Sequence, residues 1–401
     1  MTVATAAGFD PTAAEVVADP YPFLAGLRRR GPVLWHDGSG MWLAPRYAEA
    51  TAVLRDRRLG RIWRLRWPDE QLPAFTSIHL HSMLENEPPT HTRLRRVVAT
   101  AFARGHVERL RPRVAALAER LADAVADAGS DGSPLDLLPA YAEPLPVAVI
   151  AELLGVPEAD RGRLRPWSNA IVKMYEYAVS AEQRQAAERA SAEFVGYLRD
   201  LVAHRRRAPG EDLVSSLVAV SDDDGSRLSE DELVTTCTLL LNAGHEASVN
   251  VVGNGVLALL RHPGELARLR SDPTLVPAAV EEMIRYDAPL QLFERTATED
   301  AEIGGVTVAA GQKIAALLGS ANRDPAAFAD PDRFDVSRAT GPHLGFGAGI
   351  HFCLGAPLAR VELQVSLATL LRRFPRLALA GTPVRRPEFV IRGLLSLPVT
   401  V

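Results

Sequence analysis

The sequence predicts a mainly α fold with a small β region, organised as one large domain over residues 1–401. No low-complexity linker, internal repeat or Ser/Gly tether divides the chain. Its hydrophobic fraction of 47% is sufficient for a large core. The strongest element is a helix pattern from about Glu230 to Arg261. The middle of this pattern is almost wholly apolar, which is typical of a buried central helix.

Composition argues against several classes of protein. The net charge of −4 gives no general argument for binding nucleic acid. The N-terminal residues contain no basic region followed by an apolar core, so neither a signal peptide nor a membrane anchor is predicted. The chain has two cysteines, Cys237 and Cys353, and with no secretion signal this predicts a reducing, cytoplasmic location.

The central helix pattern has clear start and stop signals. Ser229 and Glu232 form a capping box, in which each side chain can satisfy the other residue's backbone N–H. The pair His262-Pro263 ends the pattern. The sequence therefore predicts an uninterrupted helical segment between these two signals.

A polar patch over residues 242–248 interrupts the apolar middle of this helix. Gly244 costs about 1 kcal/mol relative to alanine, and a buried Glu246 costs more unless it is satisfied. Either Gly244 allows close packing and Glu246 pairs with an arginine, or the helix is deformed at a functional site. Broken rules at a helix centre favour the functional explanation.

Two further helix patterns place charged side chains together. Glu282 and Arg285 are three residues apart, so they share a helix face and can pair. His91 and Arg95 are four residues apart and follow two prolines that make a firm helix start. Taken alone, each pair is also compatible with two charged side chains on the solvent-exposed face of a helix.

Cys353 lies in a glycine-rich loop, Phe346–Gly355, immediately before a helical pattern. It has no neighbour for a CxxC metal site and no obvious disulfide partner. A single thiolate in such a loop can ligate a haem iron. Glycines let the backbone approach a flat macrocycle and let amide groups point at the sulfur. The alternative is a buried structural cysteine in a tight turn.

The whole loop resembles the haem-binding signature of the cytochrome P450 family. Five positions fit that signature: Phe346, Gly349, His351, Cys353 and Gly355. The resemblance extends over nearly the whole chain, from residues 19–22 to residues 392–394. It implies the cytochrome P450 fold and haem b (iron protoporphyrin IX) as cofactor, with Cys353 as the axial ligand of the iron. Phe346, His351 and Gly355 are then further cofactor-binding residues.

The same resemblance assigns the charged pairs. His91 and Arg95 match the family's clamp on a haem propionate, and Arg295 and His351 match two more propionate contacts. Glu282 and Arg285 match the family's ExxR pair. Arg333, in Pro331-Asp332-Arg333-Phe334, matches the segment that contributes a third member to this structural cluster. His343, His245 and Cys237 are expected to be structural.

The polar patch in the central helix resembles the family's oxygen-activating motif. Ala243, Gly244 and Glu246 match it, but Ala247 stands where the family has a threonine. We therefore expect Glu246, Ala247 and Ser248 to be the catalytic positions. Ser248 can replace the threonine hydroxyl only if the helix is locally rotated. Otherwise a substrate hydroxyl or an ordered water must take that role.

The substrate pocket is expected to be lined by positions that these motifs do not fix. The expected substrate contacts are Leu239, Asn242, Ala243, Gln291, Leu292 and Leu394. The segment 167–178 is a further candidate. The loop over residues 59–87 is rich in aromatic and basic side chains, which indicates either stacking on a large ligand or ordinary surface packing. These side chains are Trp63, Arg64, Trp67, His79 and His81.

Taken together, the resemblance implies a soluble bacterial haem-thiolate monooxygenase. Electrons would come from ferredoxin and ferredoxin reductase. Dioxygen would be used to hydroxylate or epoxidise a hydrophobic natural product, such as a macrolide or polyketide of antibiotic biosynthesis. No nucleic-acid or membrane partner is expected. The alternatives are an oxidative coupling enzyme or a peroxide-using enzyme, both consistent with Ala247, and a haem-binding sensor without turnover.

Overall fold

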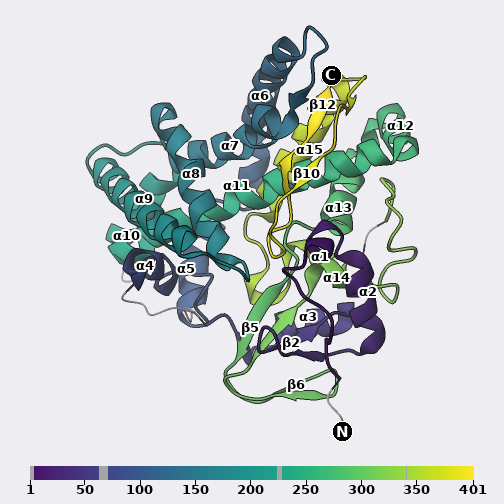
Figure 1. The fold of residues 1–401 in the computed structure, drawn as a ribbon. Helices are drawn as coiled ribbons and strands as arrows, with labels where there is room; N and C mark the ends of the chain where they lie inside the picture. The colour runs from purple at the N-terminus through teal and green to yellow at the C-terminus, as the bar shows by residue number, and fades with distance from the viewer. Residues whose placement is uncertain (1–3, 63–70, 224–227, 340) are drawn as a thin grey trace. The chain divides into compact units, whose positions relative to one another are not determined.

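The computed structural model describes residues 4–62, 71–223, 228–339 and 341–401. Trp63, Arg64 and Trp67 of the aromatic loop lie outside the described residues. The fold is mainly α with small β-sheets, as the sequence predicts (Figure 1). The chain groups into two compact units: unit 1 comprises Met1–Gly60, Ala115–Ala142 and Ala247–Val401, and unit 2 comprises Arg61–Val114 and Glu143–Glu246. One domain over residues 1–401 stays a prediction.

The described part of unit 2 is helical and contains no strand. Its longest complete helix, α9, begins at a capping box between Ser180 and Gln183 and packs against α4, α8 and α10. Helix α9 extends through Arg207, and the connection to α10 begins at Ala208. The elements are α4 (Pro73–Leu80), α5 (Thr90–Ala99), the start of α6 (Arg104–Ala128), α7 (Pro144–Leu154), η3 (Glu158–Asp160), α8 (Arg161–Val172), η4 (Lys173–Tyr175), α9 (Ala181–Arg207), α10 (Leu213–Asp223) and the start of α11 (Glu230–Arg261).

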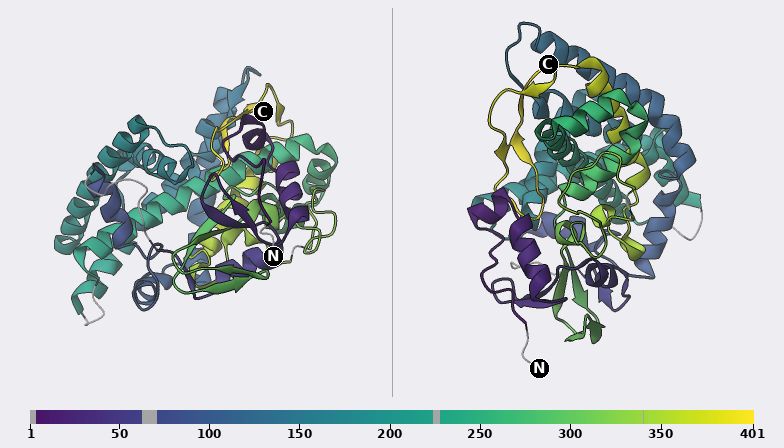
Figure 2. Two further views of the ribbon diagram at one scale, coloured as in Figure 1. Left: turned by 60° about the horizontal axis from the view of Figure 1, so that its bottom comes forward. Right: turned by 90° about the vertical axis from the view of Figure 1, so that its right-hand side faces the viewer.

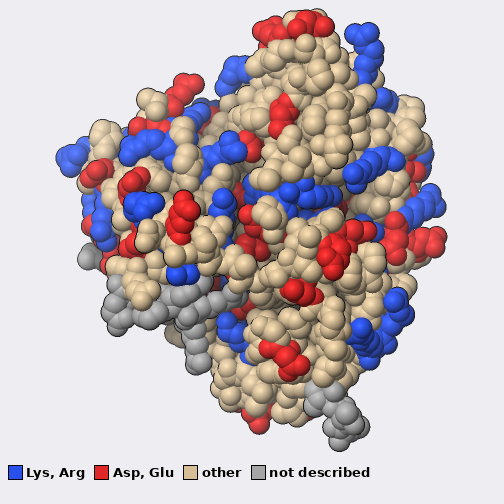
Figure 3. Space-filling view, in the orientation of Figure 1, with Lys and Arg blue, Asp and Glu red and all other residues tan. Residues whose placement is uncertain are grey.

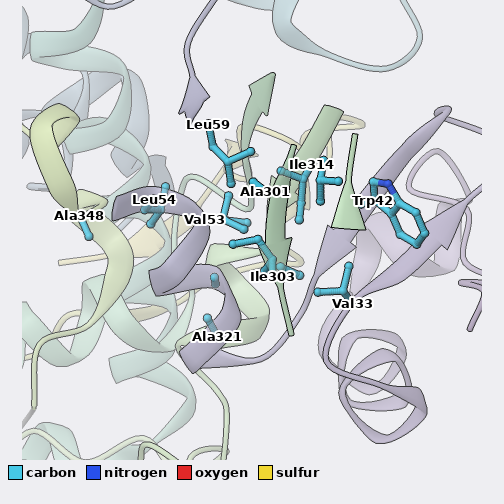
Figure 4. Packing of buried hydrophobic residues seen from close by; sticks show 14 of the residues in the cluster. Val33, Trp42, Val53, Leu54, Leu59, Ala301, Ile303, Ile314, Ala321 and Ala348 are labelled. Atoms are coloured by element: carbon cyan, nitrogen blue, oxygen red, sulfur yellow. The ribbon is translucent and has the colours of Figure 1, made fainter. Parts of the chain in front are cut away.

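Unit 1 contains the main sheet, with the strand order β1-β2-β8-β5-β3. Strands β2 and β8 are parallel, and the other neighbours in this sheet are antiparallel. The strands are β1 (Leu34–His36), β2 (Met41–Ala44), β3 (Leu59–Gly60), β5 (Phe293–Ala297) and β8 (Lys313–Ala316). Apolar side chains of the sheet, of α3 (Tyr47–Arg55) and of α14 (Leu318–Ala321) form one core (Figure 4). Leu344 and Ala348 belong to the same core, so it anchors the loop that carries Cys353.

Three smaller sheets complete unit 1: β6 (Ala301–Ile303) with β7 (Val306–Val308), β10 (Val384–Arg385) with β11 (Leu394–Ser396), and the order β4-β12-β9, formed by Leu135–Asp136, Pro398–Thr400 and Ala378–Leu379. The C-terminal strands lie beside the end of α6, as the yellow segment shows in Figures 1 and 2. The remaining elements are α1 (Ala14–Ala18), α2 (Tyr21–Arg30), η2 (Leu138–Ala142), α12 (Pro263–Ser271), η5 (Pro273–Leu275), α13 (Val276–Tyr286), η6 (Leu344–Phe346), η7 (Gly349–His351) and α15 (Ala356–Arg373).

The central helix α11 has the bounds that the sequence predicts. Its capping box is formed: the backbone N–H of Ser229 donates to Glu232 Oε2 at 2.9 Å, and the N–H of Glu232 donates to Ser229 Oγ at 3.1 Å. The backbone is α-helical without a break over the whole element, including the polar patch at residues 242–248. The sequence thus identified both ends of this helix.

The surface carries charges of both signs. Figure 3 shows acidic and basic side chains interspersed over the visible face, with no extended region of one sign, in keeping with the small net charge of −4. Within the described ranges, no helix has both the length and the hydropathy needed to cross a bilayer.

Candidate active site

Cys353 is exposed, with its sulfur in a tightly ordered turn of unit 1. Its backbone N–H donates to the carbonyl of Phe346 at 2.9 Å, and the N–H of Phe352 donates to the carbonyl of Gly349 at 3.1 Å. Helix α15 begins three residues later at Ala356, so the sulfur lies near the positive end of a helix dipole. These features favour a thiolate held in one fixed position.

Two glycines of this loop are required by its backbone. Gly347 and Gly349 have φ of +70° and +72°, a region that side-chain-bearing residues rarely adopt. A Cβ atom on Gly349 would also lie 2.3 Å from the carbonyl oxygen of Leu54 in α3. Glycine at position 349 therefore lets the loop pack directly on α3, and this contact fixes where the cysteine is displayed.

The residues present fit a haem. A rigid loop presents a thiol next to the exposed ring of Phe352, of which 40% is accessible, and this is a surface that an apolar, flat group would cover. In the part of the chain that the structure describes, no cluster of three or more His, Cys, Asp or Glu side chains could hold a bare metal ion. A metal bound with one protein ligand must bring its other ligands with it, as iron in a porphyrin does.

The four expected propionate contacts fall into both units, and each is described within its own unit. In unit 1, Arg295 lies on β5 with 3% of its surface exposed, and one of its Nη atoms donates to the carbonyl of Glu294 at 2.9 Å. His351 ends η7, within the Cys353 loop. In unit 2, His91 is buried in the first turn of α5, and Arg95 lies half-buried one turn later.

The polar patch of α11 is explained locally by packing. A Cβ atom on Gly244 would lie 2.8 Å from Cγ1 of Ile150 in α7, so glycine permits close contact between these two helices of unit 2. The expected deformation of the helix is wrong for this structure, because the backbone stays α-helical. Glu246 is buried, and its Oε2 atom lies 3.9 Å from Nε2 of His245, while its pairing with an arginine stays a prediction.

Ser248 makes a contact that the sequence argument missed. Its hydroxyl donates to Oε2 of Glu362 at 3.3 Å, and both side chains are buried in unit 1. Glu362 lies on α15, nine residues after Cys353, and most of the other buried residues of this helix are apolar. A lone carboxylate within such a helix was the available signal, since a buried charge needs a partner or must be neutral.

Burial raises the pKa of Glu362 to about 8, although the hydrogen bond from Ser248 opposes the shift. The side chain is therefore a neutral acid at pH 7. Oε2 accepts the hydrogen bond from Ser248, and Oε1 has no hydrogen-bond partner among the described residues. A carboxyl group that is mainly protonated at neutral pH thus contacts Ser248, the residue after Ala247.

The ExxR pair forms a buried cluster, but its third member is a different arginine. Arg285 donates to both carboxylate oxygens of Glu282, at 2.7 and 2.8 Å, and both side chains are fully buried. The structure corrects the prediction for Arg333, whose exposed side chain faces Asp335 at 3.6 Å. It is Arg338 whose Nε atom donates to Glu282 at 3.2 Å, while Arg333 contributes only its backbone carbonyl.

The expected substrate contacts are mostly inward-facing. Leu292 and Leu394 are buried in unit 1, while Leu239, Asn242 and Ala243 lie on α11 in unit 2, where Ala243 is exposed. Gln291 is 1% exposed, and its amide donates to the carbonyl of Ala288 at 2.7 Å while its Oε1 atom fills the space next to Gly319. Its side chain therefore supports the segment before Leu292, in which the backbone of residues 289–291 pairs with residues 390–392.

His79 of the aromatic loop is an internal packing residue. It is buried in α4, its ring lies 4.5 Å from that of Phe75, and its Nε2 atom is 3.0 Å from the hydroxyl of Tyr175. Burial lowers the pKa of His79 to about 4, so it is neutral. For this residue the structure favours ordinary packing over ligand stacking.

Comparisons with known proteins give matches over most of the chain. A model of the family described as Cytochrome P450 matches residues 71–398. The chain is 45% identical to Cytochrome P450 monooxygenase PikC of Streptomyces venezuelae, covering 96% of this chain and 92% of that protein. It is 44% identical to 6-deoxyerythronolide B hydroxylase of Saccharopolyspora erythraea, covering 95% and 96%. The crystal structure of P450BioI with a hexadec-9Z-enoic acid ligated acyl carrier protein is similar at a TM-score of 0.91 and 35% identity, covering 97% and 100% of the two chains.

Proposed function

This chain belongs to the cytochrome P450 monooxygenase family, and from that premise we propose that it hydroxylates or epoxidises a macrolide or polyketide. One observation supports this proposal most strongly. Cys353 is exposed, and its loop matches the family's haem-binding signature, in which a cysteine thiolate ligates the iron. A relative at 44% identity over almost the whole chain is named a 6-deoxyerythronolide B hydroxylase, which supports the substrate class. Cytoplasmic location stays a prediction.

The proposed cofactor is haem b: the thiolate of Cys353 would bind its iron, and His91, Arg95, Arg295 and His351 would hold its propionates. When bound, haem supplies dioxygen binding and O–O cleavage, which thiolate donation favours. Two electrons would pass from NADPH through ferredoxin reductase to ferredoxin, which would deliver them to this protein. One oxygen atom enters the substrate, and the other leaves as water after taking up two protons.

Residues of this chain supply those protons. We infer that Glu362 holds a proton on Oε1 and that the hydroxyl of Ser248 orients its carboxyl group, because the two side chains are hydrogen-bonded and buried. Ala247 carries no hydroxyl, so the final donor is either a water held by Ser248 and Glu362 or a hydroxyl or carbonyl group of the substrate that orders a water. Positioned proton transfer is typically worth about 10²–10⁴-fold in rate.

A labelling experiment tests this function. The protein reconstituted with haem, ferredoxin, ferredoxin reductase and NADPH would be given macrolides and their unoxidised precursors under ¹⁸O-labelled dioxygen. One labelled oxygen atom in the product is the expected result. A coupled or dehydrogenated product without label would favour the second candidate, an oxidative coupling enzyme. Label-free turnover driven by hydrogen peroxide alone would favour a peroxide-using enzyme, and reduction without any substrate-dependent NADPH consumption would favour a sensor.

A further inference from the structure

Arg360, on the second turn of α15, connects the Cys353 loop to α13 within unit 1. Its Nε and Nη2 atoms donate to the two carboxylate oxygens of Glu281, at 2.7 and 2.8 Å. Its guanidinium carbon also lies 4.5 Å from the centre of the Phe346 ring. The carbonyl of Phe346 accepts the backbone N–H of Cys353. One cation thus contacts the residue that closes the turn around the sulfur.

The charge of Arg360 acts on Cys353 as well as on Glu281. The pKa of Arg360 is raised, chiefly by the hydrogen bonds to Glu281 and additionally by the negative charge of Cys353. The side chain is about one-third exposed, so solvent screens this interaction without removing it. Arg360 and the positive end of α15 therefore both favour negative charge on the sulfur.

His343 also contacts Glu281. Its Nδ1 atom accepts the backbone N–H of Gly345 at 3.1 Å, and its Nε2 atom donates to Glu281 at 3.1 Å. Burial raises the pKa of Glu281, but the hydrogen bonds from Arg360 and His343 and the electrostatic attraction to both outweigh it and hold that pKa at about 2. Glu281 is therefore an anion that pairs with the cation Arg360 beside the loop.

We propose that Arg360 is a positioning residue that raises the reduction potential of the iron bound to Cys353, and that Glu281 moderates this effect. Reduction adds a negative charge to the iron–thiolate unit, and a nearby cation stabilises the added charge. Glu281 holds the guanidinium against Phe346 and partly neutralises it. The proposal rests on the proposed function, because it requires haem ligated by Cys353.

Arg360→Gln and Glu281→Gln both break the ion pair, but they remove opposite charges. An electrostatic effect on the reduction potential should therefore have opposite signs in the two variants, whereas a purely structural effect should not. In the haem-loaded protein, Arg360→Gln should lower the midpoint potential in a spectroelectrochemical titration, because the cation is lost. Glu281→Gln should raise it, because the cation remains and its counter-charge is gone. Arg360→Lys keeps the charge and should stay close to the wild-type potential. Arg372→Gln removes a charge from the same helix where it pairs with Glu119, and should produce no shift.

The proposal is overturned if Arg360→Gln and Glu281→Gln shift the potential in the same direction, or if neither shifts it. If Arg360→Gln does not fold with haem, the other two variants still test the proposal. It requires a raised midpoint potential in Glu281→Gln and an unchanged midpoint potential in Arg360→Lys. The absorption of the reduced carbon monoxide complex is recorded for each variant. A wild-type spectrum without the thiolate band would overturn the ligand assignment and this proposal together, whereas a thiolate band with unshifted potentials would overturn the role of Arg360 alone.

Discussion

The hydroxyl of Ser248 donates to Oε2 of Glu362 across 3.3 Å, and this hydrogen bond joins the central helix α11 to α15, the helix that follows Cys353. It places a neutral buried acid next to the one position where the chain departs from its family's pattern, Ala247. The family's threonine hydroxyl is absent, but the next residue of α11, Ser248, is hydrogen-bonded to a buried acid on α15.

Removing this acid should uncouple reductant consumption from product formation. Glu362→Gln and Ser248→Ala should each release peroxide and form about 10²-fold less product per NADPH, the lower end of the range of about 10²–10⁴-fold that positioned proton transfer contributes. Ser366→Ala deletes a buried hydroxyl one turn further along α15 and serves as the matched control. Wild-type coupling in Glu362→Gln would rule out the acid as the proton source.

The same acid predicts a pH dependence. Because burial raises the pKa of Glu362 to about 8, the folded protein keeps this proton below that pH and loses it above. Coupling in the wild type should therefore be steady at pH 6–7 and should fall as the pH rises through about 8. The Glu362→Gln variant, which cannot titrate there, should show no such fall. Parallel profiles for the two proteins would contradict the assignment.

A substrate analogue tests the substrate-assisted route separately. If a hydroxyl or carbonyl group of the substrate orders the water next to Ala247, an analogue lacking that group should bind but turn over with poor coupling. Ala247→Thr should restore coupling for the analogue or crowd the native substrate. Equal coupling for substrate and analogue, with Ser248→Ala severely uncoupled, would show that Ser248 and Glu362 suffice.

Ligation by Cys353 has a spectroscopic signature. The reduced carbon monoxide complex should show the red-shifted band of a thiolate-ligated haem, and Cys353→His should abolish it. Cys237→Ala is the control, because that buried thiol lies in α11 within unit 2 and packs as a small apolar side chain. A red-shifted band that persisted in Cys353→His would refute the assignment.

Loss of the propionate contacts should loosen haem. The double variant Arg95→Ala, Arg295→Ala should transfer haem faster to an apo-acceptor protein, because two charge-assisted hydrogen bonds are lost. Arg96→Ala, an exposed position on the same helix as Arg95, should leave the transfer rate unchanged. Identical rates for all three proteins would argue against the clamp.

The corrected cluster around Glu282 predicts unequal effects of two nearby arginines. Arg338→Ala should destabilise the protein by about 3 kcal/mol, because it leaves the fully buried Glu282 with one charged partner fewer. Arg333→Ala should cost less than about 1 kcal/mol, because its side chain is exposed. The free energies of unfolding of the two variants, measured with urea, test this prediction. A larger loss of stability for Arg333→Ala would show that Arg333 is the third member of the cluster after all.

The sequence by itself determined the features that depend on local spacing. The capping box at Ser229 and Glu232, the end of α11 at Arg261 and the pair Glu282–Arg285 each involve residues within one helical turn, so backbone geometry alone brings them together. The Phe346–Gly355 loop is also short-range, and its glycines report directly on backbone angles.

Only the tertiary structure decided which distant side chains meet. The choice of Arg338 over Arg333 depends on how the chain after α14 folds back on Glu282, and sequence distance does not encode that path. Gly244 proved to be a packing residue because Ile150 of α7 lies against it. Ser248 and Glu362 are more than a hundred residues apart, and the acid acquires its raised pKa only when packing removes water from around it.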